Sequence, residues 1–195
     1  CVKMKIVVGS RGGLGRGKWV VSNLLRVIGY RVYDTDSEAR RLMNTLPQLK
    51  EHLCQTFGDD IYADGTLDRP LLASRVFGHP EQIARLNALV HPAVREDFDR
   101  WSQGVRGELC FVESAILYES HLDRQVDEVW LVTAPESLRI ERVQQRSGLS
   151  ADEVKRRIAA QQGEEERCRQ ATHVICNDGR ESLIATVLSL LDKSR

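Results

Sequence analysis

The feature that most limits the fold is a glycine-rich segment between an apolar run and an amphipathic helix. Residues 6–8 predict a buried strand, and 20–28 carry apolar residues at helical spacing. Between them, the spacing of Gly12, Gly17 and Lys18 is typical of a loop whose backbone N–H groups converge on phosphate oxygens. The helix N-terminus adds partial positive charge, and the lysine reaches the outer phosphates. The whole segment reads Gly12, Gly13, Leu14, Gly15, Arg16, Gly17, Lys18.

This segment fits the P-loop pattern G-x-x-x-x-G-K, but the next position departs from it. The pattern continues with Ser or Thr, whose hydroxyl ligates Mg²⁺, and this chain has Trp19. An indole cannot ligate a hard cation, and Arg16 is also large for such a loop. A glycine-rich turn that binds nothing is therefore the alternative interpretation of the segment taken alone.

Length, charge and cysteine content narrow the class of protein. A chain of 195 residues suggests one compact domain with an appendage. Lys+Arg and Asp+Glu are both 28, which argues against a strongly basic nucleic-acid-binding surface. The five cysteines form no C-x-x-C pair, so neither a zinc site nor a disulfide framework is expected. Reduced thiols in a cytoplasmic protein fit best, and no apolar run is long enough to span a membrane. Apolar patches are modest in the sequence pattern, so a monomer is the default expectation.

Two carboxylates follow the second predicted strand. The segment 31–36 ends in Asp34 and Asp36, and Ser37 is expected to cap a helix that runs through Met43. Ligands of open parallel sheets bind outside the carboxyl ends of the strands. An aspartate there can accept a proton from a substrate hydroxyl or hold metal-bound water. The alternative is that both residues only favour the turn and the next helix N-terminus.

The segment 47–104 reads as a helical insertion between two strands of the sheet, without a strand of its own. One helix is expected to begin at Pro80 and to be interrupted at His91-Pro92. The polar candidates for an anionic substrate here are Arg69, His91 and Arg95. Taken singly, each is more often a surface residue or a satisfied polar residue.

A third strand, 109–112, ends at Glu113, which can hold Mg²⁺ through water or be a plain strand-end carboxylate. After a strand at 128–133, the segment from Arg142 to Arg169 is dense in arginines. It reads either as a solvated helix face or as a lid that closes over triphosphate. A capping box at Ser150 opens a helix, and a strand at 172–177 precedes the closing helix. Strands alternating with helices predict an α/β fold with a doubly wound parallel sheet.

Along nearly its whole length, the chain resembles the dephospho-CoA kinase family. The loop 12–18 and the pair Asp34 and Asp36 are similar to the family's loop and aspartate pair. More specific are four further segments: 64–69 (DGTLDR), 86–92 (LNALVHP), 157–161 (RIAAQ) and 174–179 (VICNDG). The resemblance implies one P-loop kinase domain (1–195), with a core of about 1–46, 105–140 and 170–195. A helical CoA-binding insertion (about 47–104) and a lid (about 141–169) complete it.

The resemblance also implies a reaction, in which Mg-ATP phosphorylates the ribose 3′-hydroxyl of dephospho-CoA, giving ADP and CoA. Asp36 matches the proposed base, with Lys18 and the lid arginines Arg142 and Arg146 near the phosphates. Nucleotide binding is expected from residues 12–19 and Asn177. Substrate contacts are expected from Asp34, Asp36, Arg69, His91, Arg95 and Glu113. The resemblance implies no direct metal ligand here, since Trp19 replaces the usual one. Asp36 and Glu113 are the candidates for holding a metal through water.

The departures from the family lie in the first twenty residues. Arg11 stands where threonine is usual, Arg16 where a small residue is usual, and Trp19 where Ser or Thr is usual. Two alternatives therefore stay open beside the leading hypothesis. One is another nucleoside or nucleotide kinase of similar architecture, and the other is a folded but catalytically impaired protein that binds CoA or a nucleotide.

Overall fold

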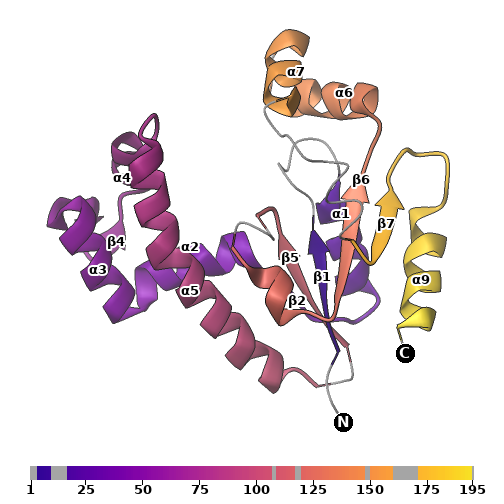
Figure 1. The fold of residues 1–195 in the computed structure, drawn as a ribbon, viewed down its shortest axis with the longest axis horizontal. Coiled ribbons are helices and arrows are strands. Elements are labelled where there is room, and N and C mark those ends of the chain that lie inside the picture. Colours follow the sequence, from indigo (N-terminus) through magenta and orange to yellow (C-terminus); the bar gives the residue numbers. More distant parts are fainter. Residues whose placement is uncertain are drawn as a thin grey trace. The chain divides into compact units, whose positions relative to one another are not determined.

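The computed structural model describes residues 4–9, 17–106, 109–116, 120–147, 150–159 and 171–194. The chain forms two compact units. One comprises 1–33 together with 105–195, and the other comprises 34–104. Each unit contains its own set of helices and strands (Figure 1).

The first unit is built on a parallel sheet with the strand order β2-β5-β1-β6-β7 (Figure 1). The strands are β1 (Met4–Gly9), β2 (Val32–Asp34), β5 (Leu109–Ser114), β6 (Glu128–Thr133) and β7 (His173–Cys176). Strand β1 lies between β5 and β6, and its Val8 is in register with Glu113. The end of β5 therefore lies beside the end of β1, from which the glycine segment departs. The predicted parallel α/β sheet is confirmed.

The helices of this unit are α1 (Lys18–Val27), α6 (Glu136–Ser147), α7 (Ala151–Ala159) and α9 (Leu183–Lys193), with a 3₁₀ turn at Leu122–Gln125. The predicted capping box opens α7, because Ser150 N donates to Glu153 Oε2 at 3.0 Å and Glu153 N donates to Ser150 Oγ at 3.3 Å. Helices α1 and α9 pack with the strands into one apolar core. Its buried members include Ile6, Val8, Val21, Leu25, Phe111, Trp130, Ile175 and Val187.

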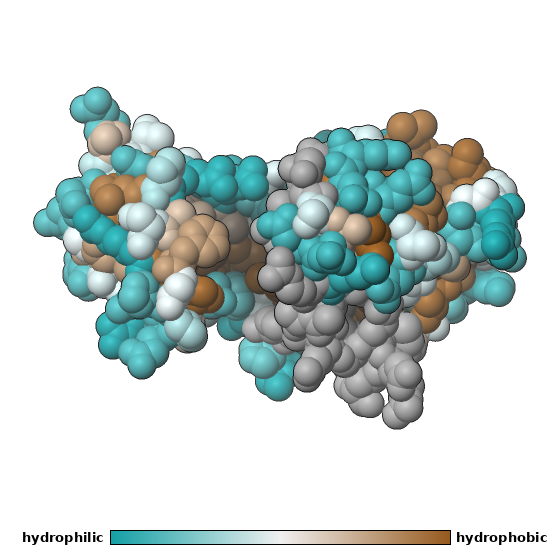
Figure 2. All heavy atoms as spheres, turned by 90° about the horizontal axis from the view of Figure 1, so that it is seen from above, coloured by the Kyte–Doolittle hydropathy of each residue, from teal (hydrophilic) through white to brown (hydrophobic). Residues whose placement is uncertain are grey.

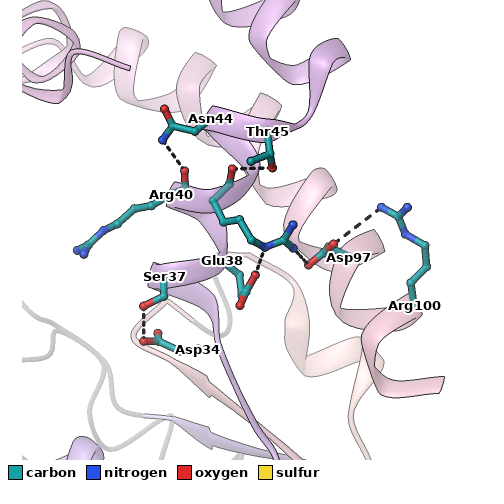
Figure 3. A network of polar contacts seen from close by, with 9 residues as sticks. Asp34, Ser37, Glu38, Arg40, Asn44, Thr45, Asp97 and Arg100 are labelled. Atoms are coloured by element: carbon teal, nitrogen blue, oxygen red, sulfur yellow. Dashed lines mark hydrogen bonds and ion pairs between the residues drawn. The ribbon is translucent and has the colours of Figure 1, made fainter. Parts of the chain in front are cut away.

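The second unit is mainly helical. It contains α2 (Thr35–Thr45), α3 (Pro47–Phe57), a 3₁₀ turn at Asp59–Ile61, β3 (Tyr62–Ala63), β4 (Thr66–Leu67), α4 (Arg69–Val76) and α5 (Pro80–Gly104). Its buried apolar residues include Leu42, Leu49, Leu53, Phe57, Ile61, Leu72, Val94 and Phe98. A polar network joins α2 to α5 (Figure 3). In it, Arg41 bonds to Glu38 on its own helix and to Asp97 on α5, at 2.6 Å from Nη2 to Oδ2.

Three local expectations for this unit were wrong. Helix α2 begins at Thr35 instead of after Ser37, because Asp34 is the N-cap that accepts from Asp36 N. A short antiparallel hairpin, β3–β4, occurs where no strand was expected, and Asp64 and Gly65 form its turn with positive φ. Helix α5 also continues through Pro92. A proline inside a helix removes one backbone hydrogen bond without ending a helix that tertiary packing supports.

Candidate active site

The start of helix α1 forms the first part of the site. Gly17 is the N-cap of α1 with φ +80°, a left-handed conformation that favours glycine. A Cβ added there would lie 2.2 Å from Asn177 Nδ2, so the side chain of Asn177 occupies the space beside this glycine. Gly17 also has no side chain to cap the first N–H groups of α1. Backbone N–H groups at a helix N-terminus are a natural place for a phosphate.

Lys18 is the first residue of α1, and its ammonium group faces a carboxylate at the end of β5. Lys18 Nζ lies 3.5 Å from Glu113 Oε1, and Glu113 is only 6% exposed. Arg26, two turns further along α1, places Nη2 3.6 Å from Glu113 Oε2. The structure therefore brings together the two predicted site residues Lys18 and Glu113, and it adds Arg26.

Arg142 of α6 and Asn177, which follows β7, form the second part of the site. Arg142 Nη1 donates to the backbone oxygen of Asn177 at 3.1 Å, and Nη2 lies 3.4 Å from Asn177 Oδ1. Asn177 is itself fixed, because its N–H donates to Thr133 O at 2.8 Å. Since Asn177 also borders Gly17, one amide side chain links the start of α1 to the arginine of α6.

The side chains available to ligate Mg²⁺ are limited by Trp19 and by the partners of Glu113. The Trp19 side chain is 57% exposed and carries no oxygen. Glu113 already faces two cationic groups. Within the described part of the chain, no three His, Cys, Asp or Glu side chains come together as a metal site. The Trp19 side chain therefore offers no ligand for Mg²⁺, and the carboxylate of Glu113 is engaged by cations.

Asp34 and Asp36 lie where β2 passes into α2, in the helical unit. Asp34 Oδ1 accepts from Asp36 N at 3.1 Å, and Asp34 Oδ2 accepts from Ser37 Oγ at 2.8 Å (Figure 3). Asp34 therefore caps the helix, the structural role that the sequence left open for it. Asp36 lies in the first turn of α2 and is exposed.

The three candidates for an anionic substrate lie on two helices of the same unit. Arg69 is the first residue of α4 and is exposed. His91 and Arg95 lie on α5 at i, i+4 spacing, so they occupy one face of that helix. Their roles toward a substrate stay predictions.

Several predicted site residues lie outside the described part of the chain. They are Gly12, Gly13, Leu14, Gly15 and Arg16, and the side chain of Arg146. The sequence analysis missed Arg26, although a signal for it was present. Lys18 and Arg26 are separated by two turns of the predicted helix, so they lie on one face.

The fold and this site define the class of protein first. A parallel sheet whose central strand leads through a glycine segment into a helix with lysine in its first turn is the arrangement of a P-loop kinase. A solved shikimate kinase from Bacteroides thetaiotaomicron has the same fold, with a TM-score of 0.59 at 12% identity over 98% of this chain and 97% of that one.

The sequence then defines the family. The family model described as "Dephospho-CoA kinase" matches residues 6–182, and the chain belongs to this family. A curated dephospho-CoA kinase from Bacteroides fragilis is 38% identical over 189 residues, which is 96% of this chain and 92% of that protein. The crystal structure of TT1252 from Thermus thermophilus covers 100% of this chain and 98% of its own, with a TM-score of 0.83 and 34% identity.

Proposed function

We propose that this protein transfers the γ-phosphoryl group of ATP to the ribose 3′-hydroxyl of dephospho-CoA, the last step of coenzyme A synthesis. The observation that carries the proposal is the family match over residues 6–182, which spans the glycine segment, the helical unit and the end of β7. The geometry at the start of α1 supports it. Left-handed Gly17 precedes the N-terminus of α1, and Lys18 lies in the first turn.

The nucleotide is bound by the first unit in this proposal. The loop amides of residues 12–17 and the N–H groups at the start of α1 bind the β- and γ-phosphates, and Lys18 neutralises part of their charge. Arg142 and Arg146 of α6 stabilise the charge that spreads over the phosphoryl oxygens during transfer. Asn177 orients Arg142, since both of its oxygens face that guanidinium.

Asp36 is the general base in this proposal. Its carboxylate accepts the proton of the 3′-hydroxyl, the freed oxygen forms a bond to the γ-phosphorus, and the bond from that phosphorus to the β–γ bridging oxygen breaks. ADP leaves with the bonding electron pair. The position of Asp36 in the first turn of α2, with its N–H bonded to Asp34, supports a fixed orientation of this backbone.

The acceptor is bound mainly by the helical unit. Arg69, His91 and Arg95 supply positive charge or hydrogen-bond donors for the phosphates of dephospho-CoA, and Asp34 and Glu113 complete the predicted polar contacts. Any Mg²⁺ enters as part of the nucleotide complex, because Trp19 replaces the usual hydroxyl ligand.

We further propose a cytoplasmic monomer that binds small molecules and neither nucleic acid nor membrane. Among the described residues, no helix is both long and apolar enough to cross a bilayer. Ile184 and Leu188 on α9 and Val174 on β7 are exposed, and apolar surface is visible at this end of the molecule (brown, right side of Figure 2). Scattered exposed apolar residues are normal for a monomer.

A panel of acceptors tests the function. Dephospho-CoA, adenosine, AMP and shikimate are each offered with Mg-ATP, and the phosphorylated product is identified by mass spectrometry. The proposal predicts that dephospho-CoA is by far the best acceptor and that the product is CoA. A faster reaction with another acceptor contradicts it. Binding of dephospho-CoA without transfer to any acceptor supports the second candidate, an impaired binding protein, which the exposed Trp19 favours.

A further inference from the structure

The carboxylate of Glu113 is shared by two cations of one helix. Its Oε1 lies 3.5 Å from Lys18 Nζ and its Oε2 lies 3.6 Å from Arg26 Nη2. The side chain of Glu113 is 7% exposed, whereas those of Lys18 and Arg26 are 14% and 36% exposed. Among the described residues, Glu113 is thus a nearly buried charge with a cation beside each oxygen.

The two cations occupy one face of α1. Lys18, Ser22 and Arg26 follow one another at i, i+4 spacing, so they lie in a row along the helix. Ser22 is completely buried, and its hydroxyl has no hydrogen-bond partner within the described ranges. Arg26 is held from its other side as well, because Nη1 donates to Asn23 Oδ1 at 3.1 Å. The row therefore consists of a small buried residue flanked by two charged ones.

Because Lys18 is paired with Glu113, binding a phosphate requires Lys18 to move away from that carboxylate. A lysine that must bind phosphate is held here by a carboxylate, and a buried carboxylate left without a cation is costly. Each shift of Lys18 toward a phosphate weakens its pairing with Glu113. Arg26 lowers the cost of that shift because it stays beside Oε2 while Lys18 moves.

We propose that Arg26 is a positioning residue for nucleotide binding, which shares the charge of Glu113 and so leaves Lys18 available for phosphate. The inference rests on the proposed function only in requiring that ATP is the phosphoryl donor. In this proposal Arg26 contacts Glu113 and neither the substrate nor the reacting atoms. It acts through Glu113, and that makes its effect dependent on the charge at position 113.

A double-mutant cycle tests this dependence. The dissociation constant of ATP, without acceptor, is measured by calorimetry for the unchanged protein, Arg26→Gln, Glu113→Gln and the double variant. We expect Arg26→Gln to weaken ATP binding about five- to tenfold, and the double variant to bind like Glu113→Gln within about twofold. Arg31→Gln is the matched control, because Arg31 is an exposed arginine just beyond α1. Arg31→Gln should leave the dissociation constant of ATP unchanged.

Three results would overturn the inference. One is an ATP affinity of Arg26→Gln equal to that of the unchanged protein. Another is a double variant whose loss is the product of the two single losses, since a purely structural role for Arg26 is indifferent to the charge at 113. Arg26→Lys keeps the charge and should bind within about twofold of the unchanged protein. A loss as large as that of Arg26→Gln also overturns the inference.

The outcome is separable from that of the proposed function. If another acceptor is phosphorylated fastest, the proposed reaction is wrong, but the double-mutant cycle of ATP binding still tests the role of Arg26. If the cycle is additive but dephospho-CoA is phosphorylated, only the role of Arg26 fails. If the unchanged protein binds no ATP, both fail.

Discussion

Arg142 donates to the backbone oxygen of Asn177 at 3.1 Å, and its second terminal nitrogen lies 3.4 Å from the side-chain oxygen of the same residue. These two contacts orient the guanidinium of Arg142, on α6, toward the end of β7. Because Asn177 also fills the space beside Gly17, it links the start of α1 to α6, two elements distant in sequence.

The first prediction concerns this arginine. Arg142→Lys keeps the charge but loses the planar fork that contacts both oxygens of Asn177. We expect kcat/KM for ATP to fall about 10- to 100-fold, with little change in thermal stability. Steady-state kinetics at saturating dephospho-CoA measure this. Arg180→Lys, an exposed arginine in the turn after β7, is the control and should keep full activity. Equal losses in both variants would argue against a specific role for Arg142.

A second prediction concerns the glycine at the start of α1. Gly17→Ala combines a positive φ of 80° with a Cβ placed 2.2 Å from Asn177 Nδ2. We expect a loss of about 1–2 kcal/mol in unfolding free energy and a loss of ATP binding. Gly29→Ala is the matched control, because its φ is 101° but nothing lies within 4 Å of the added Cβ. It should cost similar stability, as measured by urea unfolding, and leave ATP binding intact.

The polar network of the helical unit gives a third prediction. Hydrogen bonds to Glu38 and Asp97 raise the pKa of Arg41, and the Asp97 side chain is 16% exposed. Asp97→Asn should lower the unfolding free energy by about 1 kcal/mol, because the pair is partly exposed and screened by solvent. ATP affinity should not change. Glu96→Gln, an exposed neighbour on α5, is the control for loss of one negative charge. Unaltered stability in Asp97→Asn would show that the network contributes nothing measurable.

The fourth prediction concerns pH. Burial raises the pKa of Tyr62 to about 12, and its hydroxyl donates to Met43 O at 2.6 Å. Since the folded-state pKa lies above the unfolded value of 10.0, folding favours the protonated phenol. The contribution is complete below pH 10 and is lost as the pH rises through about 12. Urea unfolding of the protein and of Tyr62→Phe should therefore converge between these pH values. A stability difference that is constant with pH would contradict this.

Much of the fold could be predicted from the sequence. The alternation of strands and helices gave the parallel sheet, and the family match confirms the dephospho-CoA kinase resemblance. These signals are local and strongly periodic, which is the kind that sequence patterns carry well. The capping box at Ser150 was recognised for the same reason.

The missed features depend on tertiary context. Pro92 lies inside a continuous α5 because the packing of α5 against α2, α3 and α4 outweighs one lost hydrogen bond. The hairpin β3–β4 is stabilised by a contact with α2, because Leu67 N donates to Asn44 Oδ1 at 2.9 Å. Helical spacing places Arg26 on the same face as Lys18, but its contact with Glu113 depends on the pairing of β5 with β1, two segments far apart in the chain.

The most direct test of the central claim is ADP release from Mg-ATP, with and without dephospho-CoA, by this protein and by Trp19→Ser side by side. The account predicts acceptor-dependent release in both, faster in Trp19→Ser because a hydroxyl ligand for Mg²⁺ is restored. Release by Trp19→Ser alone would show a kinase fold and acceptor site impaired at one position. Acceptor-independent rates, or no release from either folded protein, would contradict the proposed function.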